Sequence, residues 1–437
     1  MANTRERMNI VIVGHVDHGK STLAGRLMAD TGSFPKGKLE QIKKSCKRNS
    51  KVFTYAFLLD ALKDERSQGI TIDSARCFLK TKKRDYIIID TPGHIEFLKN
   101  MVSGAARSDA AVLVLDAREG IRENSRRHGY LLSLLGIKQV IVCINKMDLV
   151  DHSKKAFDDI KSEYSKFLSK IKIEPKVFIP ISAKNGENIA RRSNFMKWYK
   201  GKTLFEEIDS LRGTKELIKR PFRMPVQDIY KFTSEGDNRK AIVGRVEEGS
   251  ISVEDDIIFY PSRKISGIKS IEMFNSPKLS TIGAGYSTSF TLKKEVSVQP
   301  GEIMCKAKEK TLPHTGSTFN TKIFWMGKEP LIENKEYKLK LGTTKTYAKV
   351  KSINTVLDAS SLKGSDAKMQ VDRHEVAECE IETGKPIAFD LIYDCEATGR
   401  FVLVDGYEIA GGGIITGADC CGLRSRRRSD TGNDIYK

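Results

Sequence analysis

The feature that most constrains this chain is a glycine-rich segment between an apolar run and a helical pattern. Ile10–Val13 favour a strand and lead directly into Gly14-His15-Val16-Asp17-His18-Gly19-Lys20-Ser21-Thr22. In this context G-x-x-x-x-G-K-S predicts a phosphate-binding loop. The glycines allow backbone N–H groups to wrap a β-phosphate, and the following helix adds the positive end of its dipole. Lys20 would supply a cation, and Ser21 a hydroxyl ligand for Mg²⁺.

Composition limits the class of protein. The chain has 437 residues, of which 39% are hydrophobic and 30% charged, as expected for about two to four globular domains. No apolar run approaches the roughly 20 residues of a membrane span, and the first residues lack a signal-peptide apolar region. The eight cysteines are scattered without C-x-x-C spacing. We therefore expect a cytoplasmic protein with reduced thiols and no membrane or transition-metal site.

The formal net charge of +19 raises the question of nucleic-acid binding. Residues 36–51 hold seven basic side chains against the single acid Glu40, and 424–428 hold four arginines. Elsewhere Lys and Glu are mixed. A solvated basic surface or an acidic protein partner accounts for this charge as well as RNA does, so charge alone does not decide the function.

Two motifs downstream of the loop carry the chemistry of hydrolysis. Gly69-Ile70-Thr71-Ile72 places a threonine hydroxyl where it can coordinate Mg²⁺ when a γ-phosphate orders the loop. Asp90-Thr91-Pro92-Gly93-His94 follows the apolar run Ile87–Ile89. Asp90 can hold the Mg²⁺ shell, the N–H of Gly93 can reach the γ-phosphate, and His94 can orient the attacking water. Alone, Thr71 would be an ordinary strand residue and His94 an inert loop histidine; the upstream loop favours the functional interpretation.

Two further motifs identify the base. Asn145-Lys146-Met147-Asp148 ends an apolar run, and the Asp148 carboxylate can accept hydrogen bonds from guanine N1–H and the 2-amino group, which adenine lacks. Ser182-Ala183-Lys184 ends another run, where a backbone N–H can meet the guanine O6 and Lys184 can cover the ring. Each motif is weak singly. Together, in this order, they predict a GTPase that binds GTP and GDP with Mg²⁺. The expected catalytic residues are Lys20, Thr71, Gly93 and His94, and the expected metal ligands are Ser21, Thr71 and Asp90.

Two sequence patterns divide the chain into an N-terminal and a C-terminal part. Up to about residue 209, β-branched apolar runs alternate with helical patterns, which predicts a doubly wound, mostly parallel α/β sheet. From Pro221 onward, short strand patterns with turn residues about every eight to twelve positions predict antiparallel barrels, and Thr311–Ser317 separates two such blocks. We expect a P-loop GTPase domain over 1–212, β-barrels over 213–310 and 311–420, and a basic, loosely ordered tail over 421–437.

The motifs resemble those of the translation-factor GTPases, the superfamily of elongation factor Tu. The resemblance continues through Arg220–Val226 and Gly244–Gly249, which look like the first barrel of that superfamily, and it covers roughly residues 8–418. It implies that Val16 and Ile70 form an apolar gate beside His94.

Several segments resemble the GTPase subunit of the two-subunit bacterial sulfate adenylyltransferases. They are Ser125–His128, Leu134–Lys138, Ile323–Met326, Tyr337–Lys340 and Thr398–Asp405. The resemblance implies GTP hydrolysis coupled to formation of adenylylsulfate and pyrophosphate by a smaller, ATP-pyrophosphatase-like catalytic subunit. That subunit usually reads V-D-D-G-K-S; His15 and His18 here are like those of elongation factors. The alternatives are an elongation-factor-like GTPase that binds aminoacyl-tRNA or the ribosome, and a GTPase that serves as an assembly switch without the catalytic partner.

Overall fold

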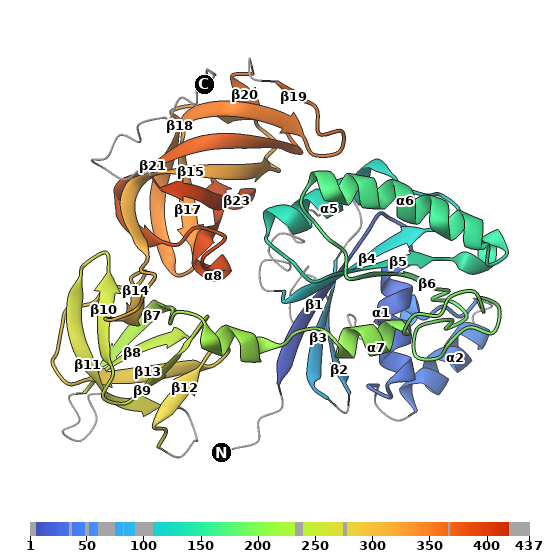
Figure 1. The fold of residues 1–437 in the computed structure, drawn as a ribbon, viewed down its shortest axis with the longest axis horizontal. Helices are drawn as coiled ribbons and strands as arrows, with labels where there is room; N and C mark the ends of the chain where they lie inside the picture. The colour runs from blue at the N-terminus through green and yellow to red at the C-terminus, as the bar shows by residue number, and fades with distance from the viewer. Residues whose placement is uncertain are drawn as a thin grey trace, which may run out of the picture.

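The chain folds into an α/β domain followed by two β-barrels, as the sequence predicts (Figure 1). This computed structural model describes residues 6–34, 37–48, 52–59, 75–81, 83–91, 108–231, 239–273, 278–365 and 368–418. Thr71, Gly93, His94 and the predicted tail over 421–437 lie outside these ranges. All six cysteines in the described ranges are free and buried.

The α/β domain is built on a six-stranded sheet with the order β2-β3-β1-β4-β5-β6. The strands are β1 (Arg7–Val13), β2 (Ala75–Lys80), β3 (Asp85–Asp90), β4 (Ala110–Asp116), β5 (Val140–Asn145) and β6 (Val177–Pro180). All neighbours pair in parallel except β2 and β3. Every residue of β4 is buried, as expected for a strand covered on both faces. The carboxyl ends of the parallel strands meet at one edge, so the loops that follow them gather there.

Helices cover both faces of this sheet (Figure 1). They are α1 (Lys20–Asp30), α2 (Lys38–Arg48), α5 (Glu123–Leu134), α6 (Lys154–Lys170) and α7 (Leu204–Asp209), with 3-10 helices η3 (Met147–Val150) and η4 (Thr214–Lys219). Helices α5 and α6 pack on one face, and α1 and α7 on the other. Helix α6 begins at Lys154 because the Ser153 hydroxyl caps it, accepting from the Ala156 N–H at 3.3 Å.

The first barrel is closed, with the order β10-β11-β13-β8-β7-β14. Its strands are β7 (Met224–Lys231), β8 (Lys240–Arg245), β10 (Asp256–Tyr260), β11 (Lys264–Glu272), β13 (Ser287–Leu292) and β14 (Ile303–Lys306), and β9 (Ser250–Ser252) pairs with β12 (Thr281–Gly283) beside it. Alternating residues such as Ile257 and Phe259 point into its core.

The second barrel has the strand order β17-β22-β23-β15-β21-β18-β19, closed by pairing of β17 with β18. Its elements are β15 (His314–Trp325), β17 (Glu336–Leu341), β18 (Thr344–Asp358), β19 (Gly364–Ser365), β21 (Glu375–Phe389), α8 (Glu396–Gly399), β22 (Arg400–Asp405) and β23 (Glu408–Ala418), with β16 (Leu331–Ile332) paired to β20 (Gln370–Val371). The prediction that Thr311–Ser317 separates the two barrels is wrong for the second half of this stretch, because β15 already begins at His314. There His314 stacks on Phe389 at 5.9 Å, and the glycine signal marks an irregularity between Gly316 and Thr318.

The α/β domain and the second barrel share one apolar core. Phe324, Met326 and Ile392 belong to the same buried cluster as Leu131 and Leu135 of the α5 region. At the edge of this contact Ser360 Oγ donates to Glu123 Oε1 at 3.3 Å. A continuous apolar contact of this kind favours a fixed arrangement of the two domains.

The two barrels are joined by a buried ion pair. Arg223, before β7, donates through Nε and Nη2 to Asp390 at 3.0 Å and to the Thr311 carbonyl at 2.8 Å. Both side chains are 1% exposed. Removing either partner alone would leave the other charge buried and unpaired, which would lower the stability of the fold by about 3–5 kcal/mol.

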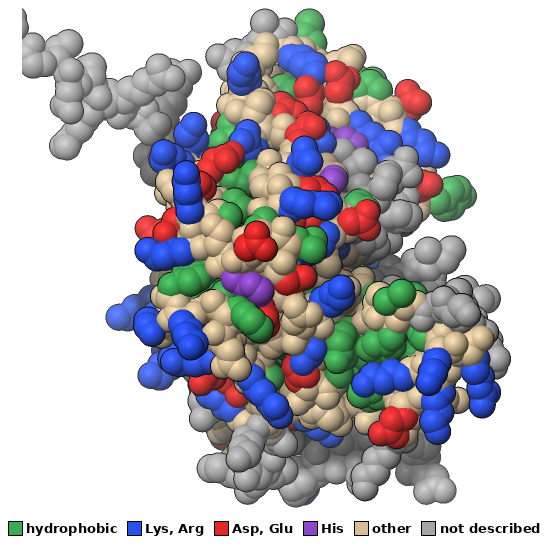
Figure 2. All heavy atoms as spheres, turned by 90° about the vertical axis from the view of Figure 1, so that its right-hand side faces the viewer, with side chains coloured by type: hydrophobic (Ala, Val, Ile, Leu, Met, Phe, Trp, Pro, Cys, Tyr) green, Lys and Arg blue, Asp and Glu red, His purple; other side chains and the backbone are tan. Residues whose placement is uncertain are grey.

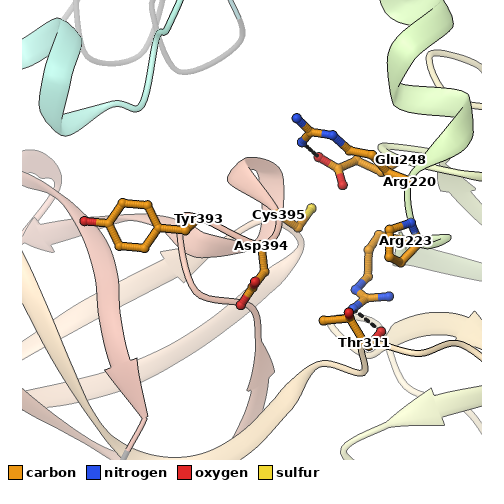
Figure 3. A pocket seen from close by; sticks show the side chains of 8 residues that line it. Arg220, Arg223, Glu248, Thr311, Tyr393, Asp394 and Cys395 are labelled. Atoms are coloured by element: carbon orange, nitrogen blue, oxygen red, sulfur yellow. Dashed lines mark hydrogen bonds and ion pairs between the residues drawn. The ribbon is translucent and has the colours of Figure 1, made fainter. Parts of the chain in front are cut away.

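A polar pocket of about 290 Å³ lies beside this pair (Figure 3). Arg220, Arg223 and Glu248 line it from the first barrel, and Tyr393, Asp394 and Cys395 from the segment before α8. Arg220 Nη1 donates to Glu248 Oε1 at 2.8 Å. Burial raises the pKa of Glu248 to about 7, against the opposing effect of Arg220.

This junction predicts a pH-dependent stability. A carboxyl group whose pKa is higher in the folded chain binds more protons when folded, so its contribution to stability falls as pH rises from 4.5 to about 7. We expect the melting temperature of Glu248→Gln to rise relative to that of the wild type across this window, since the buried His18, His128 and His374, whose lowered pKa values act in the opposite direction, titrate alike in both proteins. Differential scanning fluorimetry at several pH values measures it, with Glu247→Gln as the neighbouring control. A wild-type slope in Glu248→Gln would contradict the assignment.

Candidate nucleotide site

The phosphate loop follows β1 and packs closely against residues of β4 and β5. Gly14 has φ 150°, and a methyl group there would lie 2.4 Å from the Val114 carbonyl oxygen. Gly19 has φ 91°, and a methyl group there would lie 2.4 Å from Asn145 Nδ2. Both positions therefore require glycine. The loop shape predicted from the motif thus depends on its contacts with β4 and β5 as well as on its own sequence.

Lys20 and Ser21 are the first two residues of α1. Lys20 is buried and donates to the His15 carbonyl at 2.7 Å. Burial lowers its pKa to about 8, although Asp90 and Asp17 oppose the shift. Ser21 Oγ donates to Asp90 Oδ2 at 2.8 Å, which brings two of the predicted metal ligands together. A hydroxyl and a carboxylate are the hard oxygen donors that Mg²⁺ prefers, so this pair fits the ion.

Asn145 connects the phosphate loop with the predicted base loops. Its Nδ2 donates to the His18 carbonyl at 2.8 Å, and its Oδ1 accepts from the Ala183 N–H at 2.9 Å. Both ends of the buried amide are therefore engaged. Because Ala183 already donates to Asn145, a guanine O6 would share that N–H or use the N–H of Lys184.

Asp148 is half-buried and lies in η3, which begins directly after the left-handed residue Lys146 (φ 63°). Within the described ranges its carboxylate accepts no hydrogen bond, which leaves it available to a base. Lys146 is held in turn by Asp116, with 2.6 Å between Nζ and Oδ2. Burial of Asp116 acts to raise its pKa, but Lys146 and the Arg118 N–H outweigh it and hold the pKa below its usual range.

The loop Ser182–Lys184 is fixed from two sides. Ser182 Oγ accepts from the Asn185 N–H at 3.2 Å, and the Ser182 carbonyl accepts from Gly186 at 2.7 Å. Arg26 of α1 donates to the Lys184 carbonyl at 3.3 Å. The Lys184 side chain is exposed, as covering a ring face would require.

The two histidines of the loop have packing roles. His18 is fully buried, and its Nδ1–H donates to the Val114 carbonyl at 3.1 Å. Burial lowers the pKa of His18 to about 4, so the ring is neutral at pH 7. An aspartate there would bury a charge. His15 is half-buried, and its Nδ1 accepts from Asn124 Nδ2, on the first turn of α5, at 3.1 Å. Both side chains therefore contact the protein, with His18 facing β4 and His15 facing α5.

Sequence reasoning missed Asp116, Asn124 and Arg26. Asp116 could have been found, because it ends the apolar run 111–115 at the same sheet edge as Asp90 and Asn145. Asn124 and Arg26 carry no comparable signal, since they act across the fold from helix positions. Gly93, His94 and Thr71 lie outside the described residues, so the hydrolytic half of the site stays a prediction.

A phosphate loop with base-reading loops at one edge of a doubly wound sheet defines a P-loop nucleotide-binding protein. Residues 5–215 match the elongation factor Tu GTP binding domain, and residues 318–416 match the GTP-eEF1A C-terminal domain-like family. The chain is 35% identical to "Sulfate adenylyltransferase subunit 1" of Chromobacterium violaceum, over 92% of this chain and 83% of that protein. It is 35% identical to the protein of that name from Psychromonas ingrahamii, over 95% of this chain and 88% of that protein. It is 34% identical to the one from Francisella tularensis subsp. novicida, over 98% of this chain and 90% of that protein.

The chain therefore belongs to the sulfate adenylyltransferase subunit 1 family of elongation factor Tu-type GTPases, and it binds guanine nucleotide. The solved structure of sup35 complexed with GDP matches it over 94% of each chain, at 24% identity and a TM-score of 0.44. In the part of the chain that the structure describes, no helix is long and apolar enough to cross a membrane.

Proposed function

We propose that this chain is the GTP-hydrolysing subunit of a cytoplasmic sulfate adenylyltransferase. A smaller, ATP-pyrophosphatase-like subunit would join ATP and sulfate into adenylylsulfate and release pyrophosphate. The observation that carries the proposal is the similarity to sulfate adenylyltransferase subunit 1 across all three domains, over 92% of the chain in the Chromobacterium violaceum comparison. The guanine-site geometry supports the nucleotide half of it.

Within the site, each residue has a proposed part. The backbone N–H groups of residues 17–21 and the Lys20 ammonium bind the phosphates, and Asp148 binds the base. Ser21, Thr71 and Asp90 would hold Mg²⁺, which neutralises charge on the β- and γ-phosphate oxygens when bound. His94 orients the attacking water, and the Gly93 N–H contacts the γ-phosphate.

The coupling of the two reactions needs a physical connection between the phosphate loop and the rest of the chain. His15 accepts from Asn124, and Arg127 Nη1 donates to Asn124 Oδ1 at 3.2 Å. Arg127 also pairs with Glu123, which accepts from Ser360 of the second barrel at 3.3 Å. These contacts run from the phosphate loop through α5 to the second barrel. They support a conformational link that a nucleotide could bias.

The test is a reconstituted assay of pyrophosphate release with the smaller catalytic subunit. We expect release to require sulfate and ATP and to be strongly stimulated by GTP but not by GDP. The control is the same mixture without this chain. Failure of GTP to stimulate release would contradict the proposal, and hydrolysis stimulated by ribosomes or aminoacyl-tRNA would place the chain in translation instead.

A further inference from the structure

A strongly basic surface lies directly after the base loop, over residues 184–202, which we call the 184–202 surface. Its six cations are Lys184, Arg191, Arg192, Lys197, Lys200 and Lys202, and all are exposed. The single acid in the segment, Glu187, is buried and pairs with His152 at 2.8 Å. Among the described residues, none of the six cations forms an ion pair. Figure 2 faces this side of the α/β domain, where Lys and Arg side chains are dense.

The segment has no regular secondary structure, but side-chain hydrogen bonds fix its shape. Asn188 Oδ1 accepts from the Ser193 N–H at 2.9 Å, and Asn188 Nδ2 donates to the Pro180 carbonyl at 2.9 Å. Ser193 Oγ accepts from the N–H groups of Phe195 at 3.1 Å and Met196 at 3.2 Å. The surface is therefore pre-organised, which lowers the entropy cost of binding a partner.

Phe195 stands on this surface as an exposed aromatic side chain. It is 71% exposed and stacks on the His152 ring at 5.0 Å and 18°. The ring that supports Phe195 is itself held, because His152 Nε2 lies 2.8 Å from Glu187 Oε2, and the His152 carbonyl accepts from Trp198 Nε1 at 3.0 Å. Leu149, three residues before His152, is 51% exposed. Exposed aromatic side chains held rigidly among arginines are typical of the energetic centres of protein interfaces.

We propose that the 184–202 surface docks an acidic face of the smaller catalytic subunit, with Phe195 inserted into an apolar site between the carboxylates. The inference rests on the function proposed above. Because all six cations are exposed and none is neutralised by an ion pair within the described residues, the surface is electrostatically complementary to an acidic face. A protein is favoured over RNA because Phe195 already has one ring face covered by His152 and because the apolar Leu149 would gain nothing from a phosphate backbone.

Charge reversal with loss of the aromatic ring tests this surface. In the variant Arg191→Glu/Arg192→Glu/Phe195→Ala, the dissociation constant for the catalytic subunit should rise on the order of 100-fold, because it removes the anchor and reverses two charges. The control Lys338→Glu/Lys340→Glu makes the same charge change on exposed residues of β17, and it should change binding by no more than about twofold. Isothermal titration calorimetry of the purified subunits measures both.

Folding and specificity have their own controls. Each variant should bind a fluorescent GDP analogue as the wild type does, because none of the substituted residues belongs to the nucleotide site. The milder Arg191→Gln/Phe195→Ala should show an intermediate loss if the full variant folds poorly. Absence of any complex with the wild-type chain would overturn the proposed function and the docking surface together. A complex of wild-type strength in both surface variants would overturn the docking surface alone. So would surface variants that lose binding of a uridine oligonucleotide more strongly than binding of the catalytic subunit.

Discussion

Replacing Asp148 by Asn is expected to reduce affinity for GDP and GTP by on the order of 100-fold to 1000-fold and to create binding of xanthine nucleotides. The carboxylate can accept from both the N1–H and the 2-amino group of guanine. An amide offers one acceptor and one donor, so it leaves a base donor facing a donor. Charged hydrogen bonds are worth about 1.5–3 kcal/mol, and an unpaired polar group costs about 1–3 kcal/mol more. Xanthine carries an oxygen at position 2, which the new amide can meet as a donor.

Titration with fluorescent guanosine and xanthosine diphosphates measures this exchange. Asp151→Asn is the matched control, because Asp151 lies in the same turn but is exposed. It should leave both affinities unchanged. Guanine binding of normal strength in Asp148→Asn would show that the base is recognised elsewhere, and the free carboxylate in η3 would then have no assigned function.

The sequence was sufficient to predict the α/β fold because the relevant signals are local. The runs 111–115 and 140–144 are continuous and β-branched, which requires burial on both faces, and their strands lie side by side in the sheet. Strands β5 and β6 then place Asn145 and Ser182 at the same edge. Proximity of the phosphate loop and the base motifs therefore follows from the parallel topology alone.

The contacts between domains could not be predicted in this way. Arg223 and Asp390 are separated by 167 residues, and nothing in either local pattern identifies the other. His18 likewise gives no local sign that its ring faces Val114 of β4. Each depends on which barrel face or strand lies opposite, and this is set by packing summed over many residues. For the same reason, a motif identifies the residues near a nucleotide but not those, such as Asp116, that hold them in place.

Replacing His94 by Ala is expected to slow GTP hydrolysis by about 100-fold to 10,000-fold while leaving nucleotide affinity nearly unchanged. The described part of the chain supports the location. Thr91 Oγ1 donates to the Ile12 carbonyl at 2.7 Å, and Asp90 contacts Ser21, so the segment that carries His94 starts beside the phosphate loop. His94 follows Thr91 by three residues, which span at most about 11 Å, so the proposed position of His94 beside a γ-phosphate is compatible with the chain length.

Single-turnover hydrolysis of GTP, with the protein in saturating excess, measures the rate, and titration with the GDP analogue measures affinity. His314→Ala, in the second barrel, controls for loss of a histidine elsewhere. His94→Gln separates the two possible roles, because glutamine can hydrogen-bond a water but cannot accept its proton. We expect Gln to retain much more activity than Ala, since His94 is proposed to position the water. Equal losses in the two variants would assign proton transfer to His94, and a wild-type rate in His94→Ala would remove it from the mechanism.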